Sequence, residues 1–445
     1  MNDNLHQVTI ESIDIEGNGV AKIDGMAVFV NGALPGEIVK IQIIKSKSNF
    51  AKARLIEIIT PSVNRVTPKC PNFGICGGCS LQHMDEQTQL NSKQQALLDN
   101  LNHIGRTTPI KVLSPVSDSF WGYRNRARLS ARYVIKKQSA LVGFRERASS
   151  YVADITQCEI LPLEISNLIP KLRELLAKLT IFDKIPQIEV AIGDNLNILV
   201  FRIMDGVNEA DQKLIKQFVD SNNDLTKPLQ IWLQPKGPDS CYPFYPQSSD
   251  QLHYKLPQFN ITMPFYPTEF TQVNPTINQK MVALAMELLN PQANELIYDF
   301  FCGIGNFTLP IARSCKQVIG FEGSNALVNR ATSNAKFNQL ENTASFQEVN
   351  LFTINSEWLS NLATANKWLI DPPRDGAVDL IKAITPQTAP AEIVYVSCNP
   401  GTLARDSAIL TQVHGYTLVS AGIINMFPHT SHVESIAHFK LNYNG

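Results

Sequence analysis

The sequence predicts three domains: a small N-terminal β-barrel, a central mainly β domain with a four-cysteine cluster, and a C-terminal α/β domain with a Rossmann-like parallel sheet. Three observations lead to this prediction. Short alternating strands fill residues 8–60, three cysteines are compressed into residues 70–79, and helical and strand patterns alternate from residue 275 onward. A length of 445 residues fits about three domains of roughly 150 residues. We expect the boundaries at 1–62, 63–270 and 271–445.

The composition is that of an ordinary globular protein, with 44% hydrophobic and 18% charged residues. No run of apolar residues approaches the 18 that a membrane-spanning helix needs. The first residues also lack the basic and apolar regions of a signal peptide. We therefore expect a cytoplasmic protein without a membrane partner, and we expect a monomer.

The first domain is predicted to be a barrel because short turn sequences separate its alternating strands. The turns are Glu16-Gly-Asn-Gly, Asp24-Gly25 and Leu34-Pro-Gly36. About five strands in sixty residues are typical of the small OB-like barrels that bind oligonucleotides. The helix predicted over 85–105 lies beyond this barrel and could dock on the C-terminal domain.

The formal net charge of -1 conceals two basic segments. Residues 37–69 hold seven basic and two acidic side chains, and residues 120–150 hold eight basic side chains and one acidic. In the second segment four arginines fall on one face of a predicted strand, with apolar residues on the other. A solvated surface would explain an arbitrary charge cluster, but four arginines on one strand face would repel one another unless phosphates or carboxylates lay against them. The candidate RNA-binding residues are Arg124, Arg126, Arg128 and Arg132.

The cysteine cluster has the form C-x5-C-x2-C, over Cys70, Cys76 and Cys79. In a cytosolic chain this spacing indicates a metal site rather than a disulfide. A fourth thiolate is needed for a four-cysteine zinc site or a [4Fe–4S] cluster, and Cys158 is the best candidate. The spacing leaves zinc and iron–sulfur open.

The C-terminal domain begins its sheet with a strand that ends at Asp299, followed by a Gly303-Ile-Gly305 turn and a helix. Such a turn lets the backbone approach a cofactor at a helix N-terminus. The next strand ends at Glu322, where an acid can bind ribose hydroxyls. With an acid on each side of the turn and no third glycine, the pattern favours S-adenosylmethionine over NAD.

Three later segments place reactive side chains at strand ends. Asp371 precedes a rigid Pro-Pro and Arg374, Cys398 follows an apolar strand, and Glu434 precedes another. We expect the strands before Asp371 and Cys398 to be neighbours in the sheet. Ligands bind at the carboxyl edge of an open parallel sheet, so we interpret Cys398 as a nucleophile rather than a buried apolar residue. Arg374 and a positively charged methyl donor would favour its thiolate.

These motifs together resemble the RNA (uracil-5-)-methyltransferases, and most closely the iron–sulfur enzymes of that family that act on 23S rRNA. The resemblance covers essentially the whole chain, including a TRAM-like barrel and a class I methyltransferase domain. The motifs that carry it are Phe270-Thr-Gln-Val-Asn274, Asp299-Phe-Phe-Cys-Gly-Ile-Gly-Asn-Phe307, Asp371-Pro-Pro-Arg374, Ser397-Cys-Asn-Pro400 and His432-Val-Glu434.

The resemblance implies methylation of C5 of uridine 1939 in 23S rRNA, with Cys398 as nucleophile and Glu434 as base. It also implies that Cys70, Cys76, Cys79 and Cys158 hold a [4Fe–4S] cluster. The residues that it implies for contact with S-adenosylmethionine are Gln272, Phe301, Asn306, Glu322, Asn350 and Asp371.

Three other functions remain open. A tRNA uracil-54 methyltransferase or a dual-site 23S rRNA enzyme would use the same chemistry. A non-catalytic RNA-binding iron–sulfur protein would retain the fold but not the reaction, and the set of Cys398, Glu434 and Asp371 argues against it.

Overall fold

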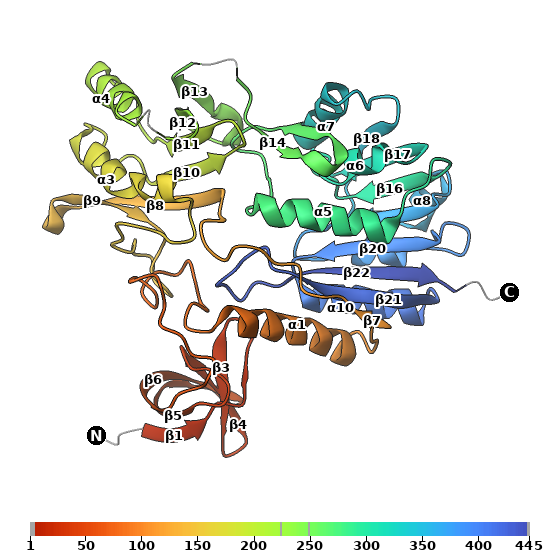
Figure 1. Ribbon diagram of the computed structural model, residues 1–445, viewed down its shortest axis with the longest axis horizontal. Coiled ribbons are helices and arrows are strands. Elements are labelled where there is room, and N and C mark those ends of the chain that lie inside the picture. The colour runs from red at the N-terminus through yellow and green to blue at the C-terminus, as the bar shows by residue number, and fades with distance from the viewer. Residues whose placement is uncertain (1–4, 223–224, 248–249, 443–445) are drawn as a thin grey trace.

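The computed structural model describes residues 5–222, 225–247 and 250–442 of the chain. Figure 1 shows a small barrel at the N-terminal end and two larger lobes above it, one central and one C-terminal. No helix within the described ranges is long and apolar enough to cross a membrane.

The N-terminal barrel has six strands, one more than the sequence pattern suggested. They run in the order β1-β5-β6-β4-β3-β2 around a core of small apolar side chains. Gly19 is required inside β3, because a Cβ there would lie 2.8 Å from the carbonyl oxygen of Ala33. The strands are β1 (Leu5–Thr9), β2 (Ser12–Ile13), β3 (Asn18–Ile23), β4 (Met26–Asn31), β5 (Ile38–Ser46) and β6 (Phe50–Thr60).

Between the barrel and the lobes lies the cysteine segment, which is mostly turns, and then the helix α1 (Glu86–His103). Asp85 caps the start of α1, because its carboxylate accepts a hydrogen bond from the Thr88 N–H. The helix packs along α10 and β21 of the C-terminal lobe.

The central lobe is a six-stranded sheet in the order β13-β12-β11-β10-β8-β9, with helices on one face. The hairpin predicted over 187–206 and the helical insertion predicted near 163–178 are both present. The elements are β8 (Arg126–Val134), β9 (Ser139–Gly143), α2 (Leu163–Ser166), α3 (Leu168–Lys178), β10 (Gln187–Ile192), β11 (Asn197–Arg202), α4 (Glu209–Asp220), β12 (Leu229–Gln234), β13 (Tyr242–Tyr245), β14 (His253–Leu256) and β15 (Ile261–Pro264), the last two forming a separate hairpin.

The C-terminal lobe is an eight-stranded sheet in the order β18-β17-β16-β19-β20-β22-β21-β7. Its first five strands are parallel, as the sequence predicted, and β22 runs antiparallel to β20. The elements are β7 (Lys111–Val112), α5 (Pro275–Leu289), β16 (Leu296–Phe300), α6 (Thr308–Ala312), β17 (Gln317–Glu322), α7 (Asn325–Phe337), β18 (Ala344–Glu348), α8 (Ser356–Ser360), β19 (Lys367–Ile370), α9 (Val378–Lys382), β20 (Glu392–Ser397), α10 (Pro400–Gln412), β21 (Tyr416–Ile424) and β22 (Glu434–Leu441).

The two lobes share a hydrophobic core. Ile198 and Val200 of β11 are buried in the same cluster as Met281 of α5 and Leu369 of β19. The barrel core, in contrast, is built only from residues of the barrel itself. The central and C-terminal lobes are therefore packed as one body, and the barrel is attached to it.

Candidate active site

The residues that the sequence singled out meet at the carboxyl edge of the parallel sheet. Strands β17, β16, β19 and β20 are consecutive neighbours, so the segments that follow them come together. The expectation that the strands before Asp371 and Cys398 are neighbours is confirmed, because β19 pairs with β20. This edge is where an open parallel sheet binds its ligands.

The glycine turn after β16 has the open backbone that a bound cofactor requires. Gly303 and Gly305 have φ values of +55° and +94°, and Phe301 is held at +64°. The Glu322 carboxylate accepts hydrogen bonds from the Gly303 N–H at 3.1 Å and the Ser324 N–H at 3.0 Å. Glu322 therefore fixes the turn and retains acceptor capacity toward a ligand.

Asp299 lies beneath this turn and is completely buried. One of its carboxylate oxygens accepts a hydrogen bond from the Thr308 hydroxyl, and the other is buried without a partner. Burial raises the pKa of Asp299 to about 8, and the charges of Asp371 and Glu322 add to the effect. Its position makes Asp299 a support for the turn rather than a freely accessible ligand.

The other residues expected to contact the cofactor differ in whether their side chains are free to bind it. The side chain of Asn306 exchanges hydrogen bonds with that of Asn278 at 2.9 and 3.0 Å, and accepts another from the Tyr254 hydroxyl at 2.8 Å. Gln272 lines a cavity beside these residues. Asn350 is exposed, and its side-chain oxygen accepts a hydrogen bond from the Phe352 N–H at 3.1 Å, so it is brought only to the rim.

The sequence analysis did not identify Tyr254 and Asn278 as residues of the site. Both lie on the wall of the cavity that Gln272 lines, and Tyr254 is almost fully buried. No motif marks either residue. The only available signal was that Asn278 lies four residues after Asn274 at the start of a predicted helix, on the same helical face.

Cys398 and Glu434 are neighbours across two strands. Ser397 at the end of β20 pairs with Ser435 of the antiparallel strand β22. Continuing this register by one position places Cys398 opposite Glu434. Glu434 is buried, and its pKa is raised well above the usual value by burial and then by the charge of Asp371. The thiol, the carboxyl and Asp371 thus form one cluster.

Arg374 favours the Cys398 thiolate, as expected, but in the ligand-free protein other groups outweigh its effect. The pKa of Cys398 is raised to about 11, first by burial and then by the charges of Glu434 and Asp371. Arg374 acts in the opposite direction but does not outweigh them. The sequence alone gave no sign that the carboxyl groups of Glu434 and Asp371 act against Arg374 at the thiol.

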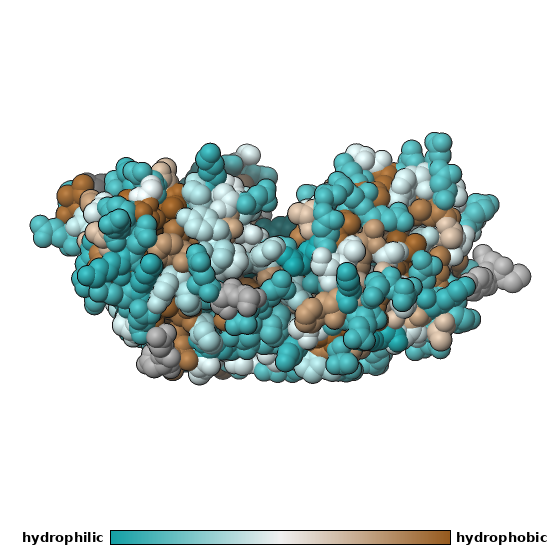
Figure 2. All heavy atoms as spheres, turned by 90° about the horizontal axis from the view of Figure 1, so that it is seen from above, coloured by the Kyte–Doolittle hydropathy of each residue, from teal (hydrophilic) through white to brown (hydrophobic). Residues whose placement is uncertain are grey.

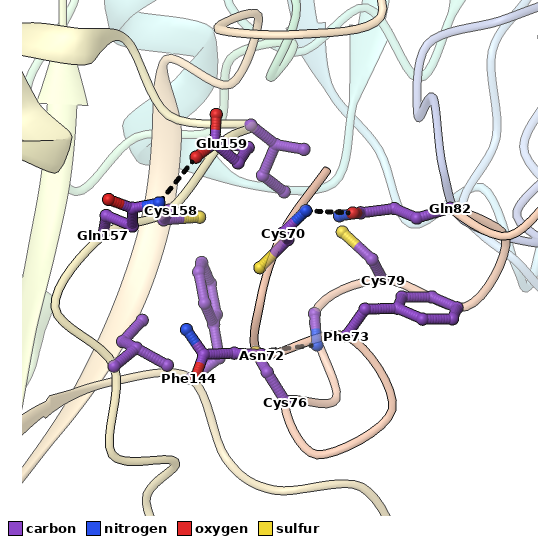
Figure 3. A pocket seen from close by; sticks show the side chains of 13 residues that line it. Cys70, Asn72, Phe73, Cys76, Cys79, Gln82, Phe144, Gln157, Cys158 and Glu159 are labelled. Atoms are coloured by element: carbon purple, nitrogen blue, oxygen red, sulfur yellow. Dashed lines mark hydrogen bonds between the residues drawn. The ribbon is translucent and has the colours of Figure 1, made fainter. Parts of the chain in front are cut away.

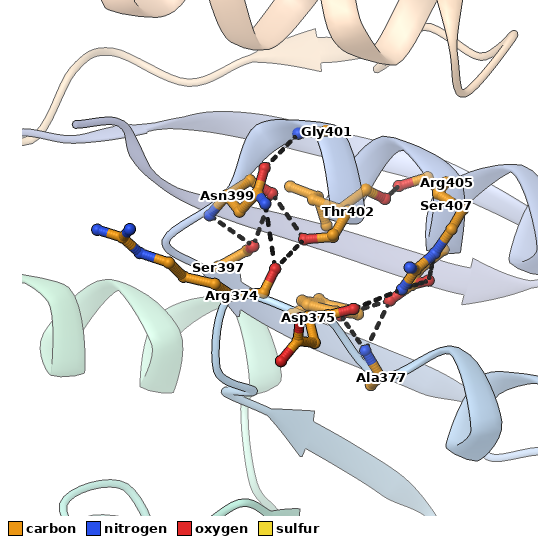
Figure 4. Close-up of polar contacts among 12 residues, drawn as sticks. Arg374, Asp375, Ala377, Ser397, Asn399, Gly401, Thr402, Arg405 and Ser407 are labelled. Atoms are coloured by element: carbon orange, nitrogen blue, oxygen red, sulfur yellow. Dashed lines mark hydrogen bonds and ion pairs between the residues drawn. The ribbon is translucent and has the colours of Figure 1, made fainter. Parts of the chain in front are cut away.

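The segment after Asp371 is held against the N-terminal turns of α10 (Figure 4). The backbone carbonyl of Arg374 accepts hydrogen bonds from the Asn399 amide at 3.1 Å and the Thr402 hydroxyl at 3.2 Å. The guanidinium of Arg374 points away from these contacts in Figure 4. The backbone is therefore fixed while the charged group stays exposed and available to a ligand.

The four cysteines line one pocket (Figure 3). The Gly78 N–H donates to the sulfur of Cys76 at 3.4 Å. Burial raises the pKa of Cys79 to about 12 and that of Cys158 to about 11, and neighbouring thiols add to both shifts. As the side chains stand, the described residues contain no group of three or more His, Cys, Asp or Glu arranged to hold a metal ion.

The four arginines do not form one uniform face. Arg126 is partly buried against the segment that connects the two lobes, where its guanidinium donates to the carbonyl oxygens of Pro267 and Glu269, each at 2.7 Å. Arg128 and Arg132 are exposed on β8. Of the two kinds of partner expected for these arginines, a carboxylate is present at one of them, because β10 places Glu189 opposite Arg128 and the two side chains pair at 3.3 Å.

Arg124 precedes β8 and lies closer to the candidate active site. Its charge, together with those of Arg374 and Lys93, contributes to the lowered pKa of His432, for which burial is the largest cause. The surface is hollowed between the two lobes, with hydrophilic residues at the floor of the cleft (Figure 2). A single-stranded segment of RNA could enter a cleft of this kind.

Comparisons with known proteins agree with this architecture. Residues 253–440 match the tRNA (Uracil-5-)-methyltransferase family model, and residues 6–56 match the TRAM domain model. A crystal structure of the Pyrococcus abyssi tRNA (uracil-54, C5)-methyltransferase in complex with S-adenosyl-L-homocysteine has the same fold. Its TM-score is 0.74 at 22% identity, over 98% of this chain and 100% of the other.

Two curated relatives are much more similar in sequence, and both are named 23S rRNA (uracil(1939)-C(5))-methyltransferase RlmD. The protein of Chromobacterium violaceum is 54% identical over 97% of this chain and 84% of its own length. That of Nitrosospira multiformis is 51% identical over 97% and 98%. With the TRAM barrel and the methyltransferase lobe in place, the chain belongs to the RlmD family of 23S rRNA uracil-C5 methyltransferases.

Proposed function

We propose that this chain transfers a methyl group from S-adenosylmethionine to C5 of a uridine in 23S rRNA, and that the target is uridine 1939, as in the names of its relatives. The observation that carries the proposal is the cluster of Cys398, Glu434 and Asp371 beside the glycine turn at one sheet edge. These are the nucleophile, base and positioning acid that the reaction needs.

C5 of uracil is too weak a nucleophile to take a methyl group unaided. Addition of the Cys398 thiolate to C6 forms a sulfur–carbon bond and moves electron density to C5. C5 then attacks the methyl group, whose bond to the sulfonium sulfur breaks so that S-adenosylhomocysteine leaves as a neutral thioether. Glu434 next removes the proton from C5, the C5–C6 double bond re-forms, and the bond between Cys398 and C6 breaks. When bound, S-adenosylmethionine supplies the methyl group and a positive sulfonium charge, which would offset the carboxylates that raise the pKa of Cys398.

The proposed RNA contacts are divided between the barrel and the cleft. Turning the target base out of its stack costs a few kcal/mol, which phosphate contacts can offset. The exposed guanidinium groups of Arg128 and Arg132 are suited to such contacts, and Arg124 lies nearer to the reacting base. Arg126 would act indirectly, because its guanidinium joins the lobes that form the cleft.

We further propose that Cys70, Cys76, Cys79 and Cys158 hold a [4Fe–4S] cluster. The chemistry of the site supports this, because four thiols surround one pocket and burial with mutual repulsion disfavours their thiolates unless a cationic centre compensates them. In this role the cluster would join the segment after the barrel to the central lobe. The absorption spectrum of protein purified without oxygen tests the assignment, since zinc gives no visible absorption.

The deciding experiment incubates the purified protein with labelled S-adenosylmethionine and total RNA, and then maps the modified nucleotide. Label at uridine 1939 of 23S rRNA is the expected result. Label at uridine 54 of tRNA, or at a second 23S site, would replace the substrate assignment. An absence of label would favour a binding protein without catalytic activity.

Two variants test the proposed roles of the reacting groups. Cys398→Ala should abolish methylation while S-adenosylmethionine still binds, and any retained turnover would remove Cys398 as the nucleophile. Glu434→Gln should accumulate a covalent protein–RNA adduct that survives a denaturing gel. Free release of product by Glu434→Gln would remove Glu434 as the base.

A further inference from the structure

The loop over residues 425–433 joins β21 to β22 and ends at Glu434, the first residue of β22. The position of the Glu434 carboxyl group therefore depends on how this loop is held. The loop has no regular secondary structure of its own. Its conformation must be set by the elements packed against it.

One of these contacts is a buried lysine. Lys93 of α1 is 3% exposed, and its ammonium group donates to the Asn425 side-chain oxygen at 2.8 Å and the Phe427 carbonyl at 2.9 Å. Within the described part of the chain no carboxylate pairs with it. Burial of an unpaired ammonium is costly, and its pKa is lowered to about 7 for that reason. An apolar side chain would pack there at lower cost, but it could not fix two acceptors in the loop.

A second set of contacts fixes the middle of the loop. His429 has a φ of +62°, which is unfavourable for a residue other than glycine and persists only where the surroundings enforce it. Its carbonyl oxygen accepts the N–H groups of Ser80 and Leu81 at 2.9 and 3.0 Å. Its own N–H donates to the side chain of Gln89 at 3.0 Å. The loop is thus held by α1 and by the segment that follows Cys79.

We propose that Lys93 is a positioning residue for Glu434: by fixing Asn425 and Phe427, it holds the loop so that the carboxylate reaches the C5 proton. The inference rests on the proposed role of Glu434 as base. Lys93 would have no part in the attack of Cys398 or in the binding of the methyl donor. Its loss should therefore slow proton removal specifically, and the adduct between Cys398 and RNA should accumulate.

The test is Lys93→Met, which keeps the length of the side chain and removes its donors. With S-adenosylmethionine and a 23S rRNA fragment, kcat should fall by about tenfold or more while KM for RNA stays within about twofold. The covalent adduct on a denaturing gel should rise above the wild-type level. Gln95→Met is the matched control, because it introduces the same side chain on the exposed face of α1 and should behave as wild type.

A second variant covers the case in which Lys93→Met does not fold. Asn425→Leu leaves the lysine in place but removes one of its two acceptors, and it should accumulate the adduct to a smaller extent. Unchanged kcat, or a loss of turnover without adduct, in the folded variants would overturn the positioning role.

Glu434→Gln separates this inference from the function on which it rests. If it accumulates the adduct while neither loop variant does, Lys93 has only a packing role and the proposed mechanism stands. If it releases product freely, the base assignment fails and the role of Lys93 fails with it.

Discussion

Three carboxyl groups meet at the carboxyl edge of the sheet, and burial disfavours the charge of each. The pKa of Asp371 is raised to about 7 and that of Asp299 to about 8, while that of Glu434 lies well above its usual value. In all three, burial is the largest cause. A positively charged ligand would stabilise the ionised carboxylates, so the cluster is suited to a sulfonium rather than to a neutral thioether.

This electrostatic arrangement predicts different proton release for two related ligands. At pH 7 a group with a pKa near 7 is about half protonated, so a cation bound beside Asp371 should expel protons. S-adenosylmethionine should therefore release more protons on binding than S-adenosylhomocysteine, which lacks the sulfonium charge. Calorimetric titrations in two buffers of different ionisation enthalpy measure the difference. Equal release for both ligands would show that the carboxyl groups do not sense the sulfonium.

Asp299 provides a second prediction, on stability. Its folded-state pKa of about 8 exceeds the ordinary value of 3.8, so the unfolded chain loses this proton at a lower pH than the folded chain does. Its contribution to stability is therefore complete below pH 3.8 and is lost as pH rises toward 8. Asp299→Asn should flatten the decline in the free energy of unfolding between pH 5 and pH 8. Chemical denaturation of the ligand-free protein across that range provides the measurement, and an unchanged slope would argue against the buried acid.

At the scale of elements, strand β8 carries both an exposed arginine, Arg132, and a partly buried one, Arg126. Arg132→Ala should flatten the log–log salt dependence of RNA binding by roughly 0.7–0.9, as expected for one lost phosphate contact. Arg126→Met should leave that slope unchanged and should lower the stability by about 1–3 kcal/mol, because two carbonyl groups between the lobes lose their donor. If both variants changed the slope equally, the division of β8 into an exposed and a buried arginine would be wrong for the complex.

The same strand shows what could be predicted from sequence. Period-two alternation correctly gave β8 an apolar face, and the order of motifs gave the parallel sheet and the meeting of Asp371 with Cys398. The partners of these residues lie far away in the chain. Glu189 reaches Arg128 only through the pairing of β10 with β8. The two carboxyl groups beside Cys398, those of Asp371 and Glu434, likewise come from separate strand ends, so their effect on its pKa appears only when the sheet is assembled.

The contacts of α1 with the loop before β22 are a further case. The helix was expected from its Gln- and Leu-rich pattern, but a lysine in such a helix normally lies in solvent. Lys93 is buried because a loop more than 330 residues further along the chain covers it. No local pattern marks such a residue, and the same is true of His429, whose left-handed backbone depends on contacts from two other segments.

At the scale of the whole molecule, the charge of -1 conceals a local distribution. The basic segments lie in the barrel with its following linker and around β8, while the rest of the chain is acidic. An RNA partner would then be selected by contacts at the barrel and the cleft rather than attracted by a uniformly positive surface. The barrel is also the part of the chain whose core is independent of the lobes.

The division into barrel and lobes makes a prediction for thermal unfolding. The central and C-terminal lobes share a buried cluster and should unfold together, whereas the barrel joins them through few contacts, such as the hydrogen bond between Arg147 and Asn18 at 3.5 Å. Scanning calorimetry should therefore resolve two transitions. S-adenosylhomocysteine at about 100 times its Kd should stabilise the lobes by about 2.7 kcal/mol, because it binds only their folded state, and should leave the barrel transition where it was. A single transition, or an equal shift of both, would show instead that the barrel and the lobes unfold as one cooperative unit.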